Sequence, residues 1–134
     1  MSPMSDADFL AAFARGERPD GVFRHVDHVR LTWLLVRREG AARGEEQVAA
    51  GIRAFAAAQG VPGMYHDTLT RAWVRLVAAA LAATPAAGAD FERFLAAQPQ
   101  LAEKSLVFRF YSPAALSVPA ARSGWVEPDL QPLP

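Results

Sequence analysis

The fold class of this chain is set by one stretch, Phe23-Arg24-His25-Val26-Asp27-His28-Val29-Arg30-Leu31-Thr32-Trp33-Leu34-Leu35-Val36. Its apolar residues recur at intervals of three and four: Val26, Val29, Trp33 and Val36, with Leu31, Leu34 and Leu35 widening the same stripe. Because an α-helix turns once in 3.6 residues, this spacing predicts an amphipathic helix. We expect it to begin between Phe23 and Asp27 and to run to about Arg38, with Gly40 as its stop.

The rest of the chain has the same helical spacing, and it contains no run of four to eight alternating β-branched residues. Further helices are predicted from Ser5 or Asp6 to Gly16, from about Gly44 to Gly60, from about Tyr65 to Ala83 and from Asp90 to just before Pro99, followed by a sixth segment from Leu101 to Tyr111. Glycine or proline residues end most of these segments. The sequence therefore predicts an all-α, single-domain bundle of about five to six helices over residues 1–134.

The segment 112–134 differs from the rest because it is rich in proline: Pro113, Pro119, Pro128, Pro132 and Pro134. Proline excludes a long helix, since it lacks a backbone N–H and its ring clashes with the preceding turn. The same segment also carries apolar residues, namely Leu116, Trp125, Val126, Leu130 and Leu133. We therefore expect an ordered strap packed on the bundle.

Composition excludes several classes of partner. The chain has 134 residues, with 14 basic and 14 acidic side chains and no cysteine. A chain without net charge offers no general attraction for a polyanion, so nucleic acid is not an expected partner. The most apolar stretch, residues 72–83, is shorter than the ~20 residues of a membrane span, and Met1 to Asp6 lack the pattern of a signal peptide. A cytoplasmic protein without membrane contact is expected.

All three histidines fall in two short segments that resemble each other. His28-Val29-Arg30-Leu31-Thr32 and His66-Asp67-Thr68-Leu69-Thr70 share the pattern His-x-x-Leu-Thr, and His25 precedes the first by one helical step of three residues. Both segments are expected at helix beginnings. We predict that the three histidines line one pocket for a small-molecule ligand.

Two kinds of chemistry fit this pocket. His25 and His28 share a helix face, so that with His66 they provide three imidazole nitrogens, a ligand set typical of divalent metals such as catalytic zinc. A metal-free pocket, in which a neutral imidazole acts as general acid or base near pH 7, is the favoured form. The cofactor is thus none or a divalent metal, and the residues expected to contact the ligand are Asp27, Tyr65, Thr70 and Trp73.

A different interpretation assigns these residues to structure alone. Histidine and aspartate at a helix beginning often cap it, and Thr32 and Thr70 can bond to their own helix backbone. The chain would then be a non-catalytic accessory or binding protein, with a structural hydrogen-bond network at the histidines and a strap that mediates association. A homodimer is one such association.

Three motifs give the chain a wider resemblance: Phe-x-His-x-Asp-His over 23–28, Tyr-His-x-Thr-x-Thr over 65–70, and Pro-Asp-Leu-x-Pro-Leu-Pro over 128–134. With them the chain resembles a family of small all-helical bacterial proteins of unassigned function. The resemblance covers nearly the whole chain and implies a helical fold with a tail that belongs to the domain. It places His25, Asp27, His28, His66, Thr68, Thr70 and Arg122 at matching positions, and it implies no particular reaction.

Overall fold

The computed structural model describes residues 4–18, 21, 23–85 and 90–134 of the chain. Its α-helices are α1 (Asp6–Ala14), α2 (His25–Glu39), α3 (Ala41–Ala58), α4 (Asp67–Ala83), α5 (Phe91–Ala97), α6 (Pro113–Ser117) and α7 (Pro119–Ser123). Short 3-10 helices lie between them, including η2 (Pro62–Met64), η4 (Pro99–Ala102) and η5 (Lys104–Arg109). The described residues include no β-strand, so the predicted all-α fold is confirmed.

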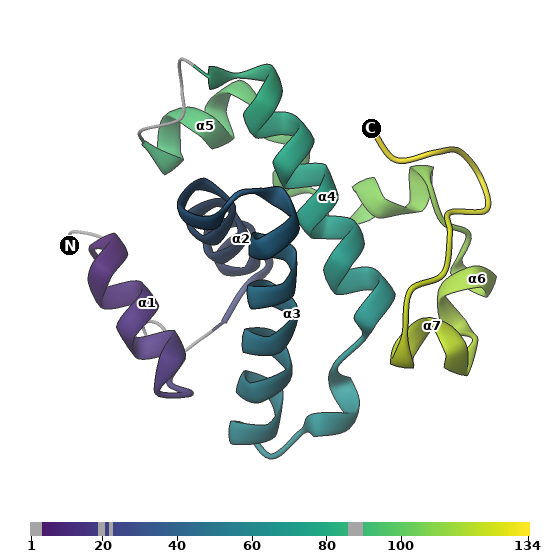
Figure 1. Cartoon of the computed structure of the whole chain (residues 1–134), viewed down its shortest axis with the longest axis horizontal. Coiled ribbons are helices and arrows are strands. Elements are labelled where there is room, and N and C mark those ends of the chain that lie inside the picture. Colours follow the sequence, from purple (N-terminus) through teal and green to yellow (C-terminus); the bar gives the residue numbers. More distant parts are fainter. Residues whose placement is uncertain (1–3, 19–20, 22, 86–89) are drawn as a thin grey trace.

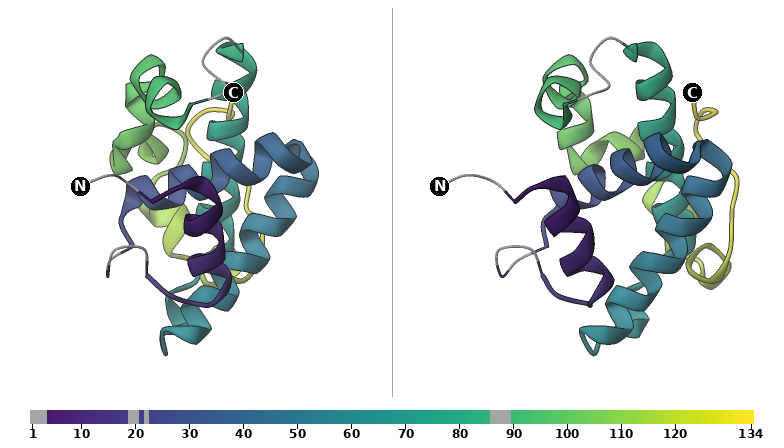
Figure 2. Two further views of the ribbon diagram at one scale, coloured as in Figure 1. Left: turned by 90° about the vertical axis from the view of Figure 1, so that its left-hand side faces the viewer. Right: turned by 60° about the vertical axis from the view of Figure 1, so that its left-hand side comes forward.

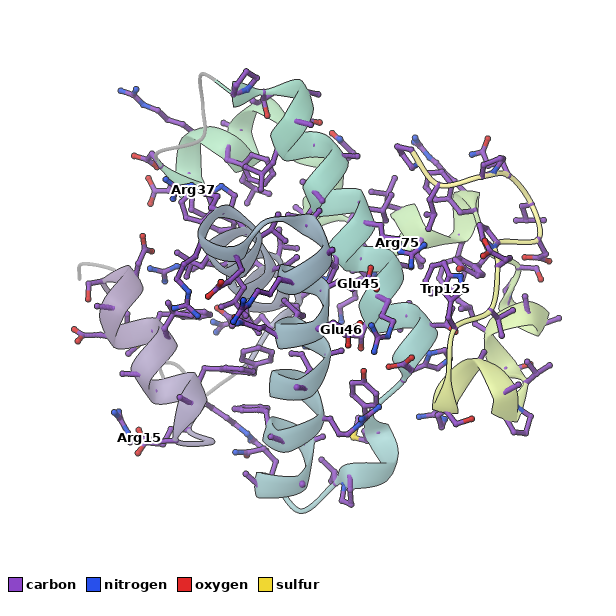
Figure 3. All side chains as sticks on the ribbon, in the orientation of Figure 1. Arg15, Arg37, Glu45, Glu46, Arg75 and Trp125 are labelled. Atoms are coloured by element: carbon purple, nitrogen blue, oxygen red, sulfur yellow. The ribbon has the colours of Figure 1, made fainter. Side chains whose placement is uncertain are left out.

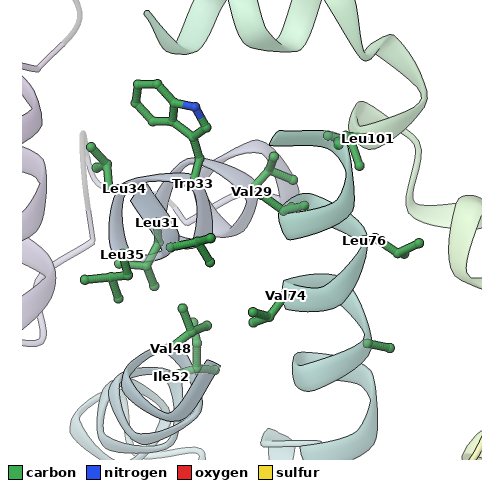
Figure 4. Close-up of a cluster of buried hydrophobic side chains, with 14 of the residues drawn as sticks. Val29, Leu31, Trp33, Leu34, Leu35, Val48, Ile52, Val74, Leu76 and Leu101 are labelled. Atoms are coloured by element: carbon green, nitrogen blue, oxygen red, sulfur yellow. The ribbon is translucent and has the colours of Figure 1, made fainter. Parts of the chain in front are cut away.

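Helices α2, α3 and α4 form the centre of the fold (Figure 1). The turned views show that α2 runs crosswise to α4 (Figure 2). The apolar faces of these helices meet in one cluster of buried side chains (Figure 4), which includes Val29, Leu31 and Leu35 of α2, Val48 and Ile52 of α3, and Val74 and Leu76 of α4. Since these residues belong to the apolar stripes of the sequence, the burial of that surface is what holds the three helices together.

Two glycines shape the corner between α2 and α3. Gly40 alone joins the two helices, and its φ of 85° lies in the left-handed region that glycine adopts without strain. Gly44, one turn into α3, lies directly on Val36 of α2, where a Cβ would come within 2.9 Å of the Val36 Cα. α3 begins at Ala41, three residues before the predicted Gly44. Gly44 is a contact point between the two helices and not the start of α3.

The outer helices cover this centre through aromatic contacts. Phe13 of α1 stacks on Phe55 of α3 with ring centroids 5.1 Å apart. At the other side, Trp33 of α2 is fully buried against Phe91 and Phe94 of α5, with centroid distances of 5.4 and 6.3 Å. These contacts hold α1 and α5 against α2 and α3.

The proline-rich segment lies along α4, on the side away from α1 (Figure 1). Thr68 of α4 holds it with two hydrogen bonds: its hydroxyl donates to the Gly124 carbonyl at 2.6 Å and accepts from the Val126 N–H at 3.0 Å. The Tyr111 hydroxyl donates to the Val126 carbonyl at 2.6 Å, and the ring of Trp125 lies edge-on to Tyr111. Polar contacts thus hold a segment that cannot form a long helix.

Some local expectations differ from the structure. The sixth segment predicted over 101–111 consists of 3-10 turns in η4 and η5, and not of one regular α-helix. Val26 is only half-buried, and Leu130 of the strap is 56% exposed, so neither belongs to the core. Among the described helices, none combines the length and the apolar character needed to cross a membrane.

Candidate functional site

A cavity of about 560 Å³ opens where the beginnings of α2 and α4 meet α3, η2 and η5. Its wall is mostly apolar, formed by Phe23, Val29, Val48, Ile52, Met64, Leu69, Trp73, Val77, Val107 and Phe108. The polar groups on this wall are Arg24, His25, His28, Thr32, Tyr65, His66, Thr70 and Lys104. A cavity of this size with few polar groups is typical of small-molecule sites, which span about 300–1,000 Å³.

The structure brings all three histidines to this cavity, and it uses two of them in hydrogen bonds to the backbone. His66 is the N-cap of α4: its Nδ1 accepts from the Leu69 N–H at 3.0 Å, and its Nε2 lies 2.7 Å from the Leu116 carbonyl. These two partners require the hydrogen to be on Nε2. His25 has its Nε2 2.9 Å from the Leu101 carbonyl, to which it donates. Both rings are therefore held by carbonyl groups from the C-terminal third of the chain.

His28 is different, because neither of its ring nitrogens has a hydrogen-bond partner among the described residues. Its ring is half-buried, edge-on to Phe23 at a centroid distance of 4.4 Å. Burial, together with the positive charge that His25 and Lys104 place nearby, lowers the pKa of His28 to about 4. His28 is thus a neutral imidazole with both nitrogens free, facing an apolar cavity.

The pKa of His25 is also lowered, mainly because burial disfavours its charged form. The Leu101 carbonyl and the Glu103 carboxylate oppose this effect, and Lys104 adds to it. The ring of His25 lies edge-on to Trp73, with centroids 4.5 Å apart. Trp73, a predicted ligand-contact residue, is therefore on the cavity wall and at the same time supports His25.

The two threonines of the repeated pattern make the same contact. The Thr32 hydroxyl donates to the His28 carbonyl at 2.8 Å, and the Thr70 hydroxyl donates to the His66 carbonyl at 2.7 Å. Each bond closes one helical turn, as Ser and Thr side chains often do inside helices. Both threonines line the cavity, and the hydroxyl hydrogen of Thr70 is donated to the backbone. Contact of Thr70 with a ligand stays a prediction.

Tyr65 also lines the cavity, but its hydroxyl points to a buried acid. The phenol donates to Asp67 Oδ1 at 2.6 Å, and burial, followed by this hydrogen bond, raises the pKa of Tyr65 to about 12. Asp67 also accepts from Arg71 at 2.9 Å. Burial alone would raise the pKa of Asp67, but the hydrogen bonds from Tyr65 and Arg71 outweigh it and lower that pKa.

These groups continue into an ion-pair network that ties α3 to α4. Arg71 contacts Glu45 at 3.1 Å and Glu46 at 2.7 Å, and Arg75 contacts Glu45 at 2.9 Å. Figure 3 shows Arg75 between Glu45 and Trp125, and its guanidinium lies 3.9 Å from the centre of the indole ring. The network runs over the outside of α3 and α4 to the strap, so Asp67 serves the packing of these elements and does not orient the ring of His66.

Asp27 does not lie on the wall of the histidine cavity. Its carboxylate accepts from the Arg24 N–H at 2.7 Å and lines a separate hollow with Arg30 and Asp90. The reason is helical geometry: residues three apart share a face, as His25 and His28 do, whereas the residue between them points elsewhere. The expectation that Asp27 contacts the same ligand as the histidines is therefore wrong.

The three histidines also do not form the metal site considered from the sequence. Across residues 4–18, 21, 23–85 and 90–134, no three histidine, aspartate or glutamate side chains gather closely enough to hold a metal ion. Both ring nitrogens of His66 are already engaged, with Leu69 and Leu116. As a helix cap, His66 has no free nitrogen to offer as the third ligand.

Sequence reasoning missed two groups at the cavity, Lys104 and Phe108. Both come from η5, which the periodicity does not connect to the histidine segments. One signal was present: Lys104 is the only lysine in a chain that has thirteen arginines. The structure also places Arg24, which precedes His25 in the sequence, on the cavity wall.

No protein family, curated protein or solved structure compared with this chain matches it. The resemblance to a family of helical bacterial proteins therefore remains a prediction.

Proposed function

We propose that this protein binds a small, largely apolar molecule in the histidine-lined cavity and that His28 is the side chain that hydrogen-bonds to it. The observation that carries the proposal is the pairing of an apolar cavity of about 560 Å³ with a neutral imidazole that has no protein partner among the described residues. A ligand in the cavity would give the His28 ring a hydrogen-bond partner that the described residues do not provide.

His25 and His66 have a supporting role in this proposal. Each donates to a backbone carbonyl, of Leu101 and Leu116 respectively, and so joins the start of a central helix to the C-terminal part of the chain. The structural interpretation of the histidines thus accounts for these two residues. It does not account for His28.

The binding proposal is tested with 2-naphthol, a neutral aromatic probe whose hydroxyl can pair with an imidazole. In NMR spectra of the ¹⁵N-labelled chain, titration should shift the amides of His28, Leu69 and Val107, while those of Asp27 and Leu95, which line the second hollow, serve as the control. His28→Leu should weaken binding by about tenfold, the effect of losing one hydrogen bond of about 1.4 kcal/mol. The proposal fails if 2-naphthol does not bind or shifts only the control amides.

A second candidate function is acid–base catalysis with His28 as general base. The specific observation is that the His28 ring lines the cavity and has no hydrogen-bond partner among the described residues, so that it can reach a proton of a bound molecule. Its lowered pKa, about 4, keeps the ring unprotonated at neutral pH and makes it a weak base. Imidazole ¹⁵N shifts measured at pH 7 test this. His28 should be neutral and exchange between both tautomers, whereas His66 should show a single tautomer with hydrogen on Nε2. A protonated His28 at pH 7 would exclude the base role.

A further inference from the structure

The charged side chains that line the cavity are all positive. Its charged side chains at neutral pH are Arg24 and Lys104, both exposed at the opening, and the described lining residues include no aspartate or glutamate. The chain as a whole has 14 basic and 14 acidic residues. The positive charge at the opening is therefore a local feature and does not follow from the composition.

These two cations are the only lysine or arginine side chains among the described residues that line this cavity. Some arginines elsewhere form ion pairs, among them Arg30 with Asp6, Arg71 with Glu46 and Arg75 with Glu45. Other arginines have no ion pair among the described residues but do not line the cavity: Arg18, Arg37, Arg93, Arg109 and Arg122. In the part of the chain that the structure describes, Arg24 and Lys104 have no such partner. Their charges are available to a molecule at the opening.

Lys104 and His28 line the same cavity and are close enough to interact electrostatically. The positive charge of Lys104 is close enough to disfavour protonation of both His28 and His25. Glu103, the neighbour of Lys104 in sequence, acts on His25 but does not line the cavity. An anionic group placed between Lys104 and the free ring of His28 would receive an ion pair from one and a hydrogen bond from the other.

The cavity changes character with depth. Val29, Val77 and Val107 on its wall are at most 2% exposed, whereas Met64 and Phe108 are 73% and 47% exposed. The interior is thus apolar, and the charged and solvent-accessible groups lie at the opening. A molecule that fits both regions has an apolar body and one polar end.

We propose that the ligand is an apolar carboxylic acid, whose carboxylate lies at the opening between Lys104, Arg24 and His28 and whose apolar body packs against the buried valines. This rests on the proposed binding function and names its ligand class. The planar guanidinium of Arg24 can donate to both oxygens of a carboxylate, and Lys104 adds a second positive charge beside it.

The experiment compares two probes of the same shape with the full chain, 2-naphthoate and its neutral amide 2-naphthamide, by isothermal titration calorimetry at pH 7.5. We expect 2-naphthoate to bind about tenfold more tightly than the amide, the effect of one charge-assisted hydrogen bond of about 1.4 kcal/mol, and to lose part of this advantage at high salt. Lys104→Met and Arg24→Met should each weaken 2-naphthoate and leave 2-naphthamide unchanged.

Arg109→Met is the matched control, because Arg109 is an exposed cation on the same η5 helix that does not line the cavity. It should leave the binding of both probes unchanged. If the two probes bind equally, or if Arg109→Met weakens 2-naphthoate as much as Lys104→Met does, the ligand class is wrong while the binding function stands. If 2-naphthol binds but neither of these two probes does, the ligand class is wrong. If none of the three binds, the binding function is wrong as well.

Discussion

The environment of His28 makes the folding stability depend on pH in a way that one substitution can isolate. In the folded chain the pKa of His28 is about 4, below the ordinary value of 6.5 that applies when the chain is unfolded. Between these two values the unfolded chain binds a proton that the folded chain does not. Acidification through this window therefore favours unfolding. The free energy of unfolding is unaffected by the titration of His28 above pH 6.5, and it decreases as the pH falls toward 4.

The size of the effect follows from the pKa difference. One pKa unit corresponds to about 1.4 kcal/mol, so the lowered pKa of His28 makes the folded state lose about 3 kcal/mol between pH 7.5 and 4. Burial is the main cause, and the positive charges of His25 and Lys104 add to it. The pKa of His25 is lowered as well, so it contributes in the same direction.

His28→Gln isolates this contribution, because glutamine keeps a polar side chain but does not titrate in this range. Urea unfolding followed by circular dichroism at several pH values between 4 and 7.5 gives the free energy of unfolding of each protein. The difference between the wild type and His28→Gln should change by about 3 kcal/mol over this range, in the sense that acid destabilises the wild type more. Groups that titrate in both proteins without interacting with His28 cancel in this difference.

Thr32→Val is the control, since Thr32 lines the same cavity one turn later and does not titrate. Its difference from the wild type should be the same at every pH. If the difference in free energy of unfolding between the wild type and His28→Gln is equally constant, the neutral, desolvated state of His28 is refuted. The proposal that this ring hydrogen-bonds to a ligand then loses its support.

Three further predictions concern the elements around the cavity. Thr68→Val removes the two hydrogen bonds to Gly124 and Val126 and should lower the free energy of unfolding by about 1–3 kcal/mol. Thr68→Ser keeps the hydroxyl and should retain most of the stability. If urea unfolding shows the same loss of free energy for both variants, the hydroxyl does not have this role. Asp67→Asn should cost about 1.5–3 kcal/mol in the same assay because Arg71 loses a buried charged partner, and an unchanged unfolding midpoint would refute this. Removal of residues 112–134 exposes Tyr111 and Thr68 and should lower the melting temperature; an unchanged value would show that the strap does not stabilise the bundle.

Periodicity predicted the helical fold because the apolar stripes of α2, α3 and α4 are long and regular. It failed for the segment 101–111, where Leu106 and Val107 are buried from 3-10 turns that no three-and-four spacing marks. The histidine cavity was predictable because its residues lie at two helix beginnings with the same pattern. The positions of Lys104 and of the Leu101 and Leu116 carbonyls could not be predicted. They lie near the histidines only because the irregular C-terminal third of the chain folds back onto α2 and α4.

The repeated pattern His-x-x-Leu-Thr shows how far a local sequence determines a site. In both copies the threonine bonds to the carbonyl of the histidine four residues earlier, so the backbone geometry repeats. The rings nevertheless differ, because His66 is the cap of its helix and bonds to Leu69 and Leu116, whereas His28 lies inside the first turns of α2, where the backbone N–H groups bond within the helix and cannot reach it. The ring of a helix cap is oriented by a backbone N–H a few residues later, as the ring of His66 is by Leu69. A ring inside the helix has no such local partner, so its hydrogen-bond partner comes from the space beside it. For His28 that space is the cavity, which is why the proposed ligand contact is assigned to His28 and not to its counterpart in the second copy.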